Sequence, residues 1–246
     1  NLRELGCHTT VDLIVGTPAE SILEVQRTQE YDLVALSSHG RSGLQRLLKG
    51  SVAEAIIRHA TTPVLVLKTD TEAPAQAEPI VPRRRPEAIL VPLDGSPSAE
   101  QALDLAAGLA RGTGAVLHLV RASPAITSGV GVQGDWHPGD PSGEREYLAQ
   151  VTARMSVQCV SAAAFGPADQ VLADYAQHHA VDLIVMNTHG RTGARRVLMG
   201  SVTESLLRTC RTPILVQRAF VEAAQAETDD DDERPGGGFV RMVGYE

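Results

Sequence analysis

The segment HGRTGARRVLMGSVTES at residues 189–205 has a near copy earlier in the chain, HGRSGLQRLLKGSVAEA at residues 39–55. The two segments lie 150 positions apart, and at that offset residues 16–68 and 166–218 share 18 identities in 53 positions. Self-similarity over this length indicates a duplicated domain rather than a short-period repeat array.

Both copies predict the same order of elements. A helical pattern that begins at a proline is followed by a short apolar strand, the glycine- and arginine-containing segment, a second helix and a closing strand. The expected elements are helices 18–31 and 51–60 with strands 32–38 and 62–68 in the first copy, and helices 167–181 and 201–210 with strands 182–188 and 212–218 in the second.

Only the second copy has a front half before these elements. There we expect strands at 88–94, 115–122 and 156–165, and helices at 98–112 and 144–155. Five strands alternating with helices predict an α/β domain with a parallel sheet. The first copy has only 15 residues before Gly16, so it is predicted to be incomplete, either because its front half was removed or because it borrows a surface from its neighbour.

Composition restricts the classes of function. Hydrophobic residues make up 43% of the chain and aromatic residues 3%, which predicts an aliphatic core typical of parallel sheets. Of the net charge of -8, the last 28 residues carry -6, from eight acids and two arginines, so a basic surface for nucleic acid is excluded. No apolar run has the length of a membrane span. Three scattered cysteines favour a reducing cytoplasm.

These patterns divide the chain into four parts. Residues 1–68 form the C-terminal half of a first domain, and residues 69–87 form a Pro- and Ala-rich extended linker. Residues 88–218 form a complete second domain. Residues 219–246 form an acidic, glycine-rich tail whose composition predicts disorder.

The duplicated segment has the features of a phosphate-binding loop. It leaves a strand at Gly190 and opens a helix at Gly200 and Ser201, with Arg191 nearby. Helix N-termini present unpaired N–H groups at the positive end of the helix dipole. A simpler interpretation stays open, because Ser201 and Glu204 fit the S-x-x-E capping box, as do their counterparts in the first copy.

Asp94 is the second candidate for ligand binding. It ends the first strand of the second copy in the segment VPLDGS, and ligands of doubly wound sheets bind beyond the carboxyl ends of the strands. There Asp94 would accept hydrogen bonds from ribose hydroxyls or help to hold a metal ion on phosphates. The alternative is that Asp94 caps the next helix. By contrast, GVGVQG at residues 129–134 is followed by no helical pattern and is interpreted as a loop.

Together these motifs resemble the universal stress protein family in a tandem arrangement, over residues 2–68 and 88–218. The family signature G-x2-G-x9-G-[ST] maps onto Asn187, Gly190, Gly200 and Ser201, and in the first copy onto Ser37, Gly40, Gly50 and Ser51. The opening glycine of the signature is therefore replaced in both copies, which adds a side chain near the expected ribose.

The resemblance implies a fold, a ligand and a set of contacts. The fold is a doubly wound, five-stranded parallel sheet of order 3-2-1-4-5, often dimerised through its last strand, here Pro213 to Gln217. The ligand is ATP or AMP, with Mg²⁺ or Mn²⁺ bound through the phosphates. The implied contacts are Pro92 and Asp94 at base and ribose, Leu119, Val120 and Met186 at adenine, Asn187 and Gly190 at ribose and phosphate, and Arg191, Gly200, Ser201 and Val202 at the phosphates. The first copy would keep an incomplete site of Gly40, Arg41, Gly50, Ser51 and Val52.

We therefore expect an adenine-nucleotide-binding regulatory protein of the stress response, which binds rather than catalyses. The sequence shows no Ser-His-Asp arrangement and no base placed to activate water, although slow ATP hydrolysis stays open. The alternatives are a nucleotide-free dimeric interaction module and a stress-response phosphatase or ATPase. Neither nucleic acid nor membrane is an expected partner.

Overall fold

The fold is described from a computed structural model, which covers residues 8–29, 31–37, 52–68, 85–123, 142–188 and 199–218. The expected acidic tail, most of the linker and the GVGVQG segment lie outside these residues.

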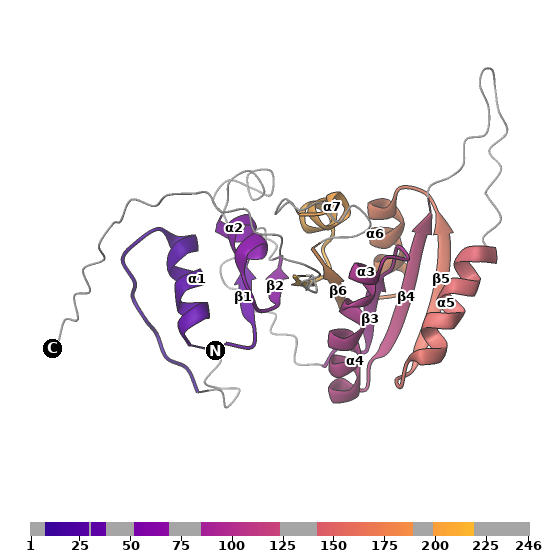
Figure 1. Cartoon of the computed structure of the whole chain (residues 1–246), viewed down its shortest axis with the longest axis horizontal. Helices are drawn as coiled ribbons and strands as arrows, with labels where there is room; N and C mark the ends of the chain where they lie inside the picture. Colours follow the sequence, from indigo (N-terminus) through magenta and orange to yellow (C-terminus); the bar gives the residue numbers. More distant parts are fainter. Residues whose placement is uncertain are drawn as a thin grey trace, which may run out of the picture.

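One seven-stranded sheet runs through the described part of the chain, with helices on both of its faces (Figure 1). The strands are β1 Val34–Ser37, β2 Val64–Leu67, β3 Ala88–Pro92, β4 Val116–Ser123, β5 Cys159–Phe165, β6 Leu183–Asn187 and β7 Ile214–Gln217. Their order across the sheet is β1-β2-β7-β6-β3-β4-β5.

The strands of the second copy confirm the expected topology. β3 pairs in parallel with β4 and with β6, β4 pairs in parallel with β5, and β6 with β7. Numbered along the second copy, these five strands have the order 3-2-1-4-5. The order of the strands reverses at β3, which places the carboxyl ends of β3 and β6 at a switch point.

The prediction of five strands is wrong for the sheet as a whole. β2 of the first copy pairs antiparallel with β7, with Val64 opposite Val216 and Val66 opposite Ile214. The sheet therefore continues from one copy into the other and is mixed rather than purely parallel. Since β7 has β6 on one side and β2 on the other, it offers no free edge for the homodimer predicted through Pro213 to Gln217.

The helices cover the two faces unequally. One face carries α1 (Pro18–Thr28), α2 (Val52–His59), α6 (Ala168–His178) and α7 (Ser201–Thr209), and the other carries α3 (Pro97–Glu100), α4 (Ala102–Thr113) and α5 (Ser142–Arg154). Thus the two helices described in the first copy lie on the same face of the sheet as α6 and α7. None of the helices in the described ranges is long and apolar enough to cross a bilayer.

The expected helix at 98–112 is two helices. Ser96 accepts a hydrogen bond from the Ala99 amide at 3.1 Å and Pro97 is the first helical residue, so α3 begins earlier than expected. The chain turns at Gln101 before α4, whose C-cap is Gly114 in the left-handed conformation. α3 is thereby a separate short element at the carboxyl end of β3.

Asp182 joins the start of β6 to the start of β3. Its Oδ2 accepts hydrogen bonds from the main-chain amides of Glu87 at 2.7 Å and Ala88 at 3.0 Å. The aligned residue of the first copy, Asp32, is exposed. Among the described residues, the hydrogen bonds that link two strands in this way are made by Asp182.

Replacing Asp182 by alanine should lower the free energy of unfolding by about 1–3 kcal/mol, because two amides lose a charged acceptor. Urea denaturation followed by circular dichroism measures the change. Asp32→Ala is the matched control and should change stability by less than about 0.5 kcal/mol. Equal losses in the two variants would contradict the role assigned to Asp182.

A cluster of two histidines and a tyrosine packs between β4 and α6. His118 Nδ1 lies 3.0 Å from the Tyr175 hydroxyl, and the Tyr175 ring stacks on His179 with centroids 4.0 Å apart. The sheet neighbours of His118 are Leu90 and Val160, neither of which titrates. Burial, and next the nearby His179, lower the pKa of His118 below its ordinary value of 6.5.

We expect this cluster to make stability depend on pH. The unfolded chain binds a proton at His118 more tightly than the folded chain, so stability should fall as pH decreases through about 6.5, until the folded-state pKa is passed. His118→Gln, which keeps a hydrogen-bonding group for Tyr175, should reduce this slope and leave stability at pH 8 little changed. Thermal denaturation between pH 5 and 8 measures this dependence. If stability changes with pH as steeply in the variant as in the wild type, a group other than His118 causes the dependence.

Candidate functional site

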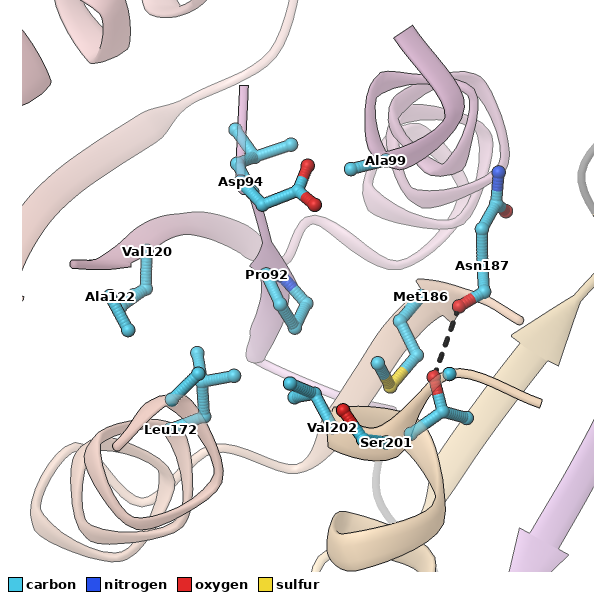
Figure 2. Close-up of a pocket in the computed structure, with 14 residues that line it drawn as sticks. Pro92, Asp94, Ala99, Val120, Ala122, Leu172, Met186, Asn187, Ser201 and Val202 are labelled. Carbon is cyan, nitrogen blue, oxygen red and sulfur yellow. Dashed lines mark hydrogen bonds between the residues drawn. The ribbon is translucent and has the colours of Figure 1, made fainter. Parts of the chain in front are cut away.

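A pocket of about 240 Å³ lies where the carboxyl ends of β3, β4 and β6 meet the first turns of α6 and α7 (Figure 2). The strands contribute four of the residues expected from the sequence, Pro92, Val120, Met186 and Asn187, and the segment after β3 contributes Asp94. The start of α7 contributes three more: Gly200, Ser201 and Val202. The pocket therefore occupies the crevice that the strand order predicts.

The connection between β6 and α7 depends on a close backbone contact. The Gly200 amide donates to the Thr188 carbonyl at 2.7 Å, and a Cβ at Gly200 would lie 3.0 Å from that same oxygen. Only glycine allows α7 to begin this close to the end of β6 without a shift of the backbone. The first turn of α7 is thereby held against the pocket.

The capping-box interpretation of Ser201 is wrong. Gly200 has the extended backbone of the N-cap, no side chain caps the helix, and Ser201 is already its first residue. The first helical hydrogen bond runs from the Glu204 amide to the Gly200 carbonyl at 2.9 Å. The amides of Ser201, Val202 and Thr203 therefore have no acceptor inside the helix and lie at the positive end of its dipole.

Asp94 lies across the pocket from these amides, and its carboxylate is oriented by the main chain. The Ser96 amide donates to Asp94 Oδ1 at 2.9 Å, and the Leu93 amide donates to the Val120 carbonyl at 2.8 Å. Ser96, not Asp94, is the N-cap of α3, so the capping role considered for Asp94 is wrong. The wall of the pocket thus carries a carboxylate held in a tight turn.

Asn187, at the position of the first signature glycine, lies at the end of β6 and is 5% exposed. Its Nδ2 donates to the Ser98 carbonyl of α3, and its own carbonyl accepts from Thr203 Oγ1 at 3.3 Å. The amide oxygen Oδ1 is buried and accepts no hydrogen bond from the described residues. In Figure 2 this amide points toward the helix that carries Ala99, away from Met186 and Val202.

The remaining surface of the pocket is apolar. Val120 and Met186 lie there as expected, together with Ala122 of β4 and Leu172 of α6, which the sequence analysis missed. The prediction that Leu119 lines the pocket is wrong, because Leu119 is fully buried on the opposite face of β4, among the residues that pack on α4 and α5. Alternation along the strand would have grouped Val120 with Ala122 and separated both from Leu119.

Further residues that line the pocket were not expected from the sequence. Leu93 and Ala99 come from the segment that follows β3, Ala168 from the start of α6 and Thr203 from α7. No motif marks them. Ala168 and Thr203 could have been suggested only by their position, because both lie in the first turn of a predicted helix near the switch point of the sheet.

Several predicted residues fall outside the described part of the chain. These are Gly190 and Arg191 in the second copy and Gly40, Arg41, Gly50 and Ser51 in the first. Val52 is described, and it lines a separate hollow between α1 and α2 together with Ala19, Leu23 and Ala55. Roles for the undescribed residues stay predictions.

Comparison with known proteins agrees with this architecture. The universal stress protein family model matches residues 2–68 and 86–218. Universal stress protein Rv2005c of Mycobacterium tuberculosis is 29% identical over 217 residues, which cover 84% of this chain and 68% of the relative. Universal stress protein MJ0531 of Methanocaldococcus jannaschii is 40% identical over 66 residues, which cover 27% of this chain and 39% of the relative.

Solved structures show the same fold. A universal stress protein from Pseudomonas aeruginosa UCBPP-PA14 aligns with a TM-score of 0.61 at 22% identity, covering 89% of this chain and 74% of that one. A universal stress protein from Archaeoglobus fulgidus aligns with a TM-score of 0.59 at 22% identity, covering 82% and 65%. The chain thus spans about two thirds of the length of the A. fulgidus protein.

The backbone contact at Gly200 predicts the effect of adding one methyl group. Gly200→Ala should lower the free energy of unfolding by about 1–3 kcal/mol, because α7 must move away from Thr188. Gly112→Ala in α4 is the control: its Cβ would meet nothing within 4 Å, so the variant should be neutral or up to about 1 kcal/mol more stable. Denaturant titration of both variants measures the difference, and a neutral Gly200→Ala would show that the contact is not required.

Proposed function

The chain belongs to the universal stress protein family, and on that premise we propose that it binds an adenine nucleotide, ATP or AMP, in the pocket between β3, β4, β6 and α7. Its role in this proposal is regulatory, within the stress response, and consists of binding rather than catalysis. Mg²⁺ or Mn²⁺ would be bound together with the phosphates.

One observation carries the proposal: uncapped amides at the start of α7 face Asp94 across an apolar cavity. The amides of Ser201, Val202 and Thr203 are suited to the oxygens of a phosphate. The Asp94 carboxylate accepts hydrogen bonds and is suited to sugar hydroxyls. The apolar surface of Val120 and Met186 is suited to the faces of a flat base.

The size of the cavity fits a part of the nucleotide. At about 240 Å³ it lies just below the usual range of ligand pockets, roughly 300–1,000 Å³. We assign the base and the sugar to this cavity, and the phosphates to the start of α7. We further propose that Gly190 and Arg191, which lie outside the described residues, contact the phosphates.

Titration calorimetry with ATP and Mg²⁺ tests this proposal. The wild-type chain should bind ATP, and Asp94→Ala should weaken binding about 10- to 100-fold, since a charged acceptor is lost. The control is Asp104→Ala, which removes an exposed carboxylate from α4 and should leave the affinity unchanged. A folded wild-type chain that binds neither ATP nor AMP, and releases no adenine on denaturation, would favour the nucleotide-free interaction module instead.

A further inference from the structure

The Asp94 carboxylate belongs to a tight turn whose centre is Gly95. The Ser96 amide donates to Asp94 Oδ1 at 2.9 Å, so one hydrogen bond spans Gly95 and fixes the carboxylate relative to the main chain. Gly95 has a φ of 86°, in the left-handed region that favours glycine. Any displacement of Gly95 therefore moves the carboxylate with it.

The side chain of Arg121, from β4, packs against this turn. A Cβ at Gly95 would lie 3.2 Å from Arg121 Nη1, 3.4 Å from Cζ and 3.5 Å from Nη2. Three similar distances show that the flat face of the guanidinium rests against Gly95. The Leu93 amide donates to the Val120 carbonyl at 2.8 Å, so the main chain and a side chain of β4 both contact the segment after β3.

Tyr147 of α5 holds the guanidinium on this turn. Arg121 Cζ lies 4.8 Å from the centroid of the Tyr147 ring, a cation–π contact. Burial and the hydrogen bond to Glu100 raise the pKa of Tyr147, the charge of Arg121 lowers it, and the charge of Asp94 raises it further. The guanidinium, the phenol and the Asp94 carboxylate thus lie close enough to act on one another.

Arg121 itself does not border the pocket. It follows Val120 along β4 and so lies on the face of the strand that carries Leu119. Its Nε is buried and has no hydrogen-bond acceptor among the described residues. A buried donor without an acceptor costs stability, so packing alone does not account for an arginine at this position.

We infer that Arg121 is a positioning residue of the proposed site: its guanidinium, packed against Gly95 and Tyr147, holds the turn in which the Asp94 carboxylate faces the pocket. The inference rests on the proposed nucleotide function and adds a residue that acts on the ligand only through Asp94. A planar guanidinium can lie flat against a backbone and on an aromatic ring, which the ammonium group of lysine cannot.

Calorimetric titrations with ATP and Mg²⁺ on the whole chain test this inference. Arg121→Met keeps the length of the side chain and removes the guanidinium, so it should weaken ATP binding about 5- to 10-fold. Arg121→Lys keeps the charge without the flat group and should weaken binding by a similar factor. The matched control is Arg145→Met, which removes the same charge from an exposed position on α5 and should change the affinity less than about 2-fold.

A double-mutant cycle separates positioning of Asp94 from general loosening of the pocket. If Arg121 acts through Asp94, Arg121→Met should change the affinity less than about 2-fold when Asp94 is already alanine. A full 5- to 10-fold loss in that background would show that Arg121 acts independently of Asp94 and would overturn the inference.

The outcomes distinguish this inference from the proposed function. If wild-type chain binds ATP and Asp94→Ala weakens binding, but Arg121→Met or Arg121→Lys binds like the wild type, the nucleotide site stands and the positioning role is removed. A folded wild-type chain that binds no ATP would remove both proposals. Thermal denaturation without ligand shows which variants are folded, and Arg121→Lys decides the matter if Arg121→Met does not fold.

Discussion

The close approach of Gly200 to Thr188 is the contact on which the pocket depends. A main-chain hydrogen bond of 2.7 Å joins Thr188, just after β6, to Gly200 at the start of α7, and a side chain at Gly200 would lie against the Thr188 carbonyl. This geometry leaves the first amides of the helix without side-chain caps, next to the carboxyl ends of the strands. This backbone contact thus places unpaired helix amides beside the crevice that the strand order creates.

The opposite wall is a four-residue helix that is held by side chains from other elements. Asn187 of β6 donates to the Ser98 carbonyl, and Glu100 accepts from Tyr147 at 2.9 Å and Arg154 at 2.7 Å, both on α5. Burial, and then the hydrogen bond to Glu100, raise the pKa of Tyr147, so this hydroxyl stays a donor. So short a helix has little stability of its own, and these contacts fix its position beside Asp94.

The two copies differ in the side-chain contact that joins their two helices. In the second copy, Ser205 Oγ donates to Asp169 Oδ2 at 2.6 Å and joins α6 to α7. The aligned residues of the first copy are Ala19 and Ala55, and a hollow between α1 and α2 lies at this position. The duplicated glycine segment is thus conserved within the chain while the helix contacts around it differ, so repeat identity alone does not predict an equivalent site.

Local patterns in the sequence determined most elements and the region of the site. Apolar runs, prolines at helix starts and the 150-residue offset identify all seven strands and their grouping, because these signals come from residues near one another in the chain. The same patterns identify Asp94 and Gly200 as candidate site residues. Asp94 follows a predicted strand, Gly200 precedes a predicted helix, and ligands of doubly wound sheets bind beyond the carboxyl ends of the strands. The order 3-2-1-4-5 came from the family resemblance.

Only the tertiary structure decided how the copies join, which face each pocket residue occupies and which groups lack partners. The pairing of β2 with β7 depends on residues far apart in the chain, and nothing in either strand alone specifies an antiparallel neighbour. Val120 lines the pocket and Leu119 does not, because successive side chains of a strand point to opposite faces of the sheet. The unpaired Oδ1 of Asn187 exists because Ser98, on another element, accepts the hydrogen bond from the other end of its amide.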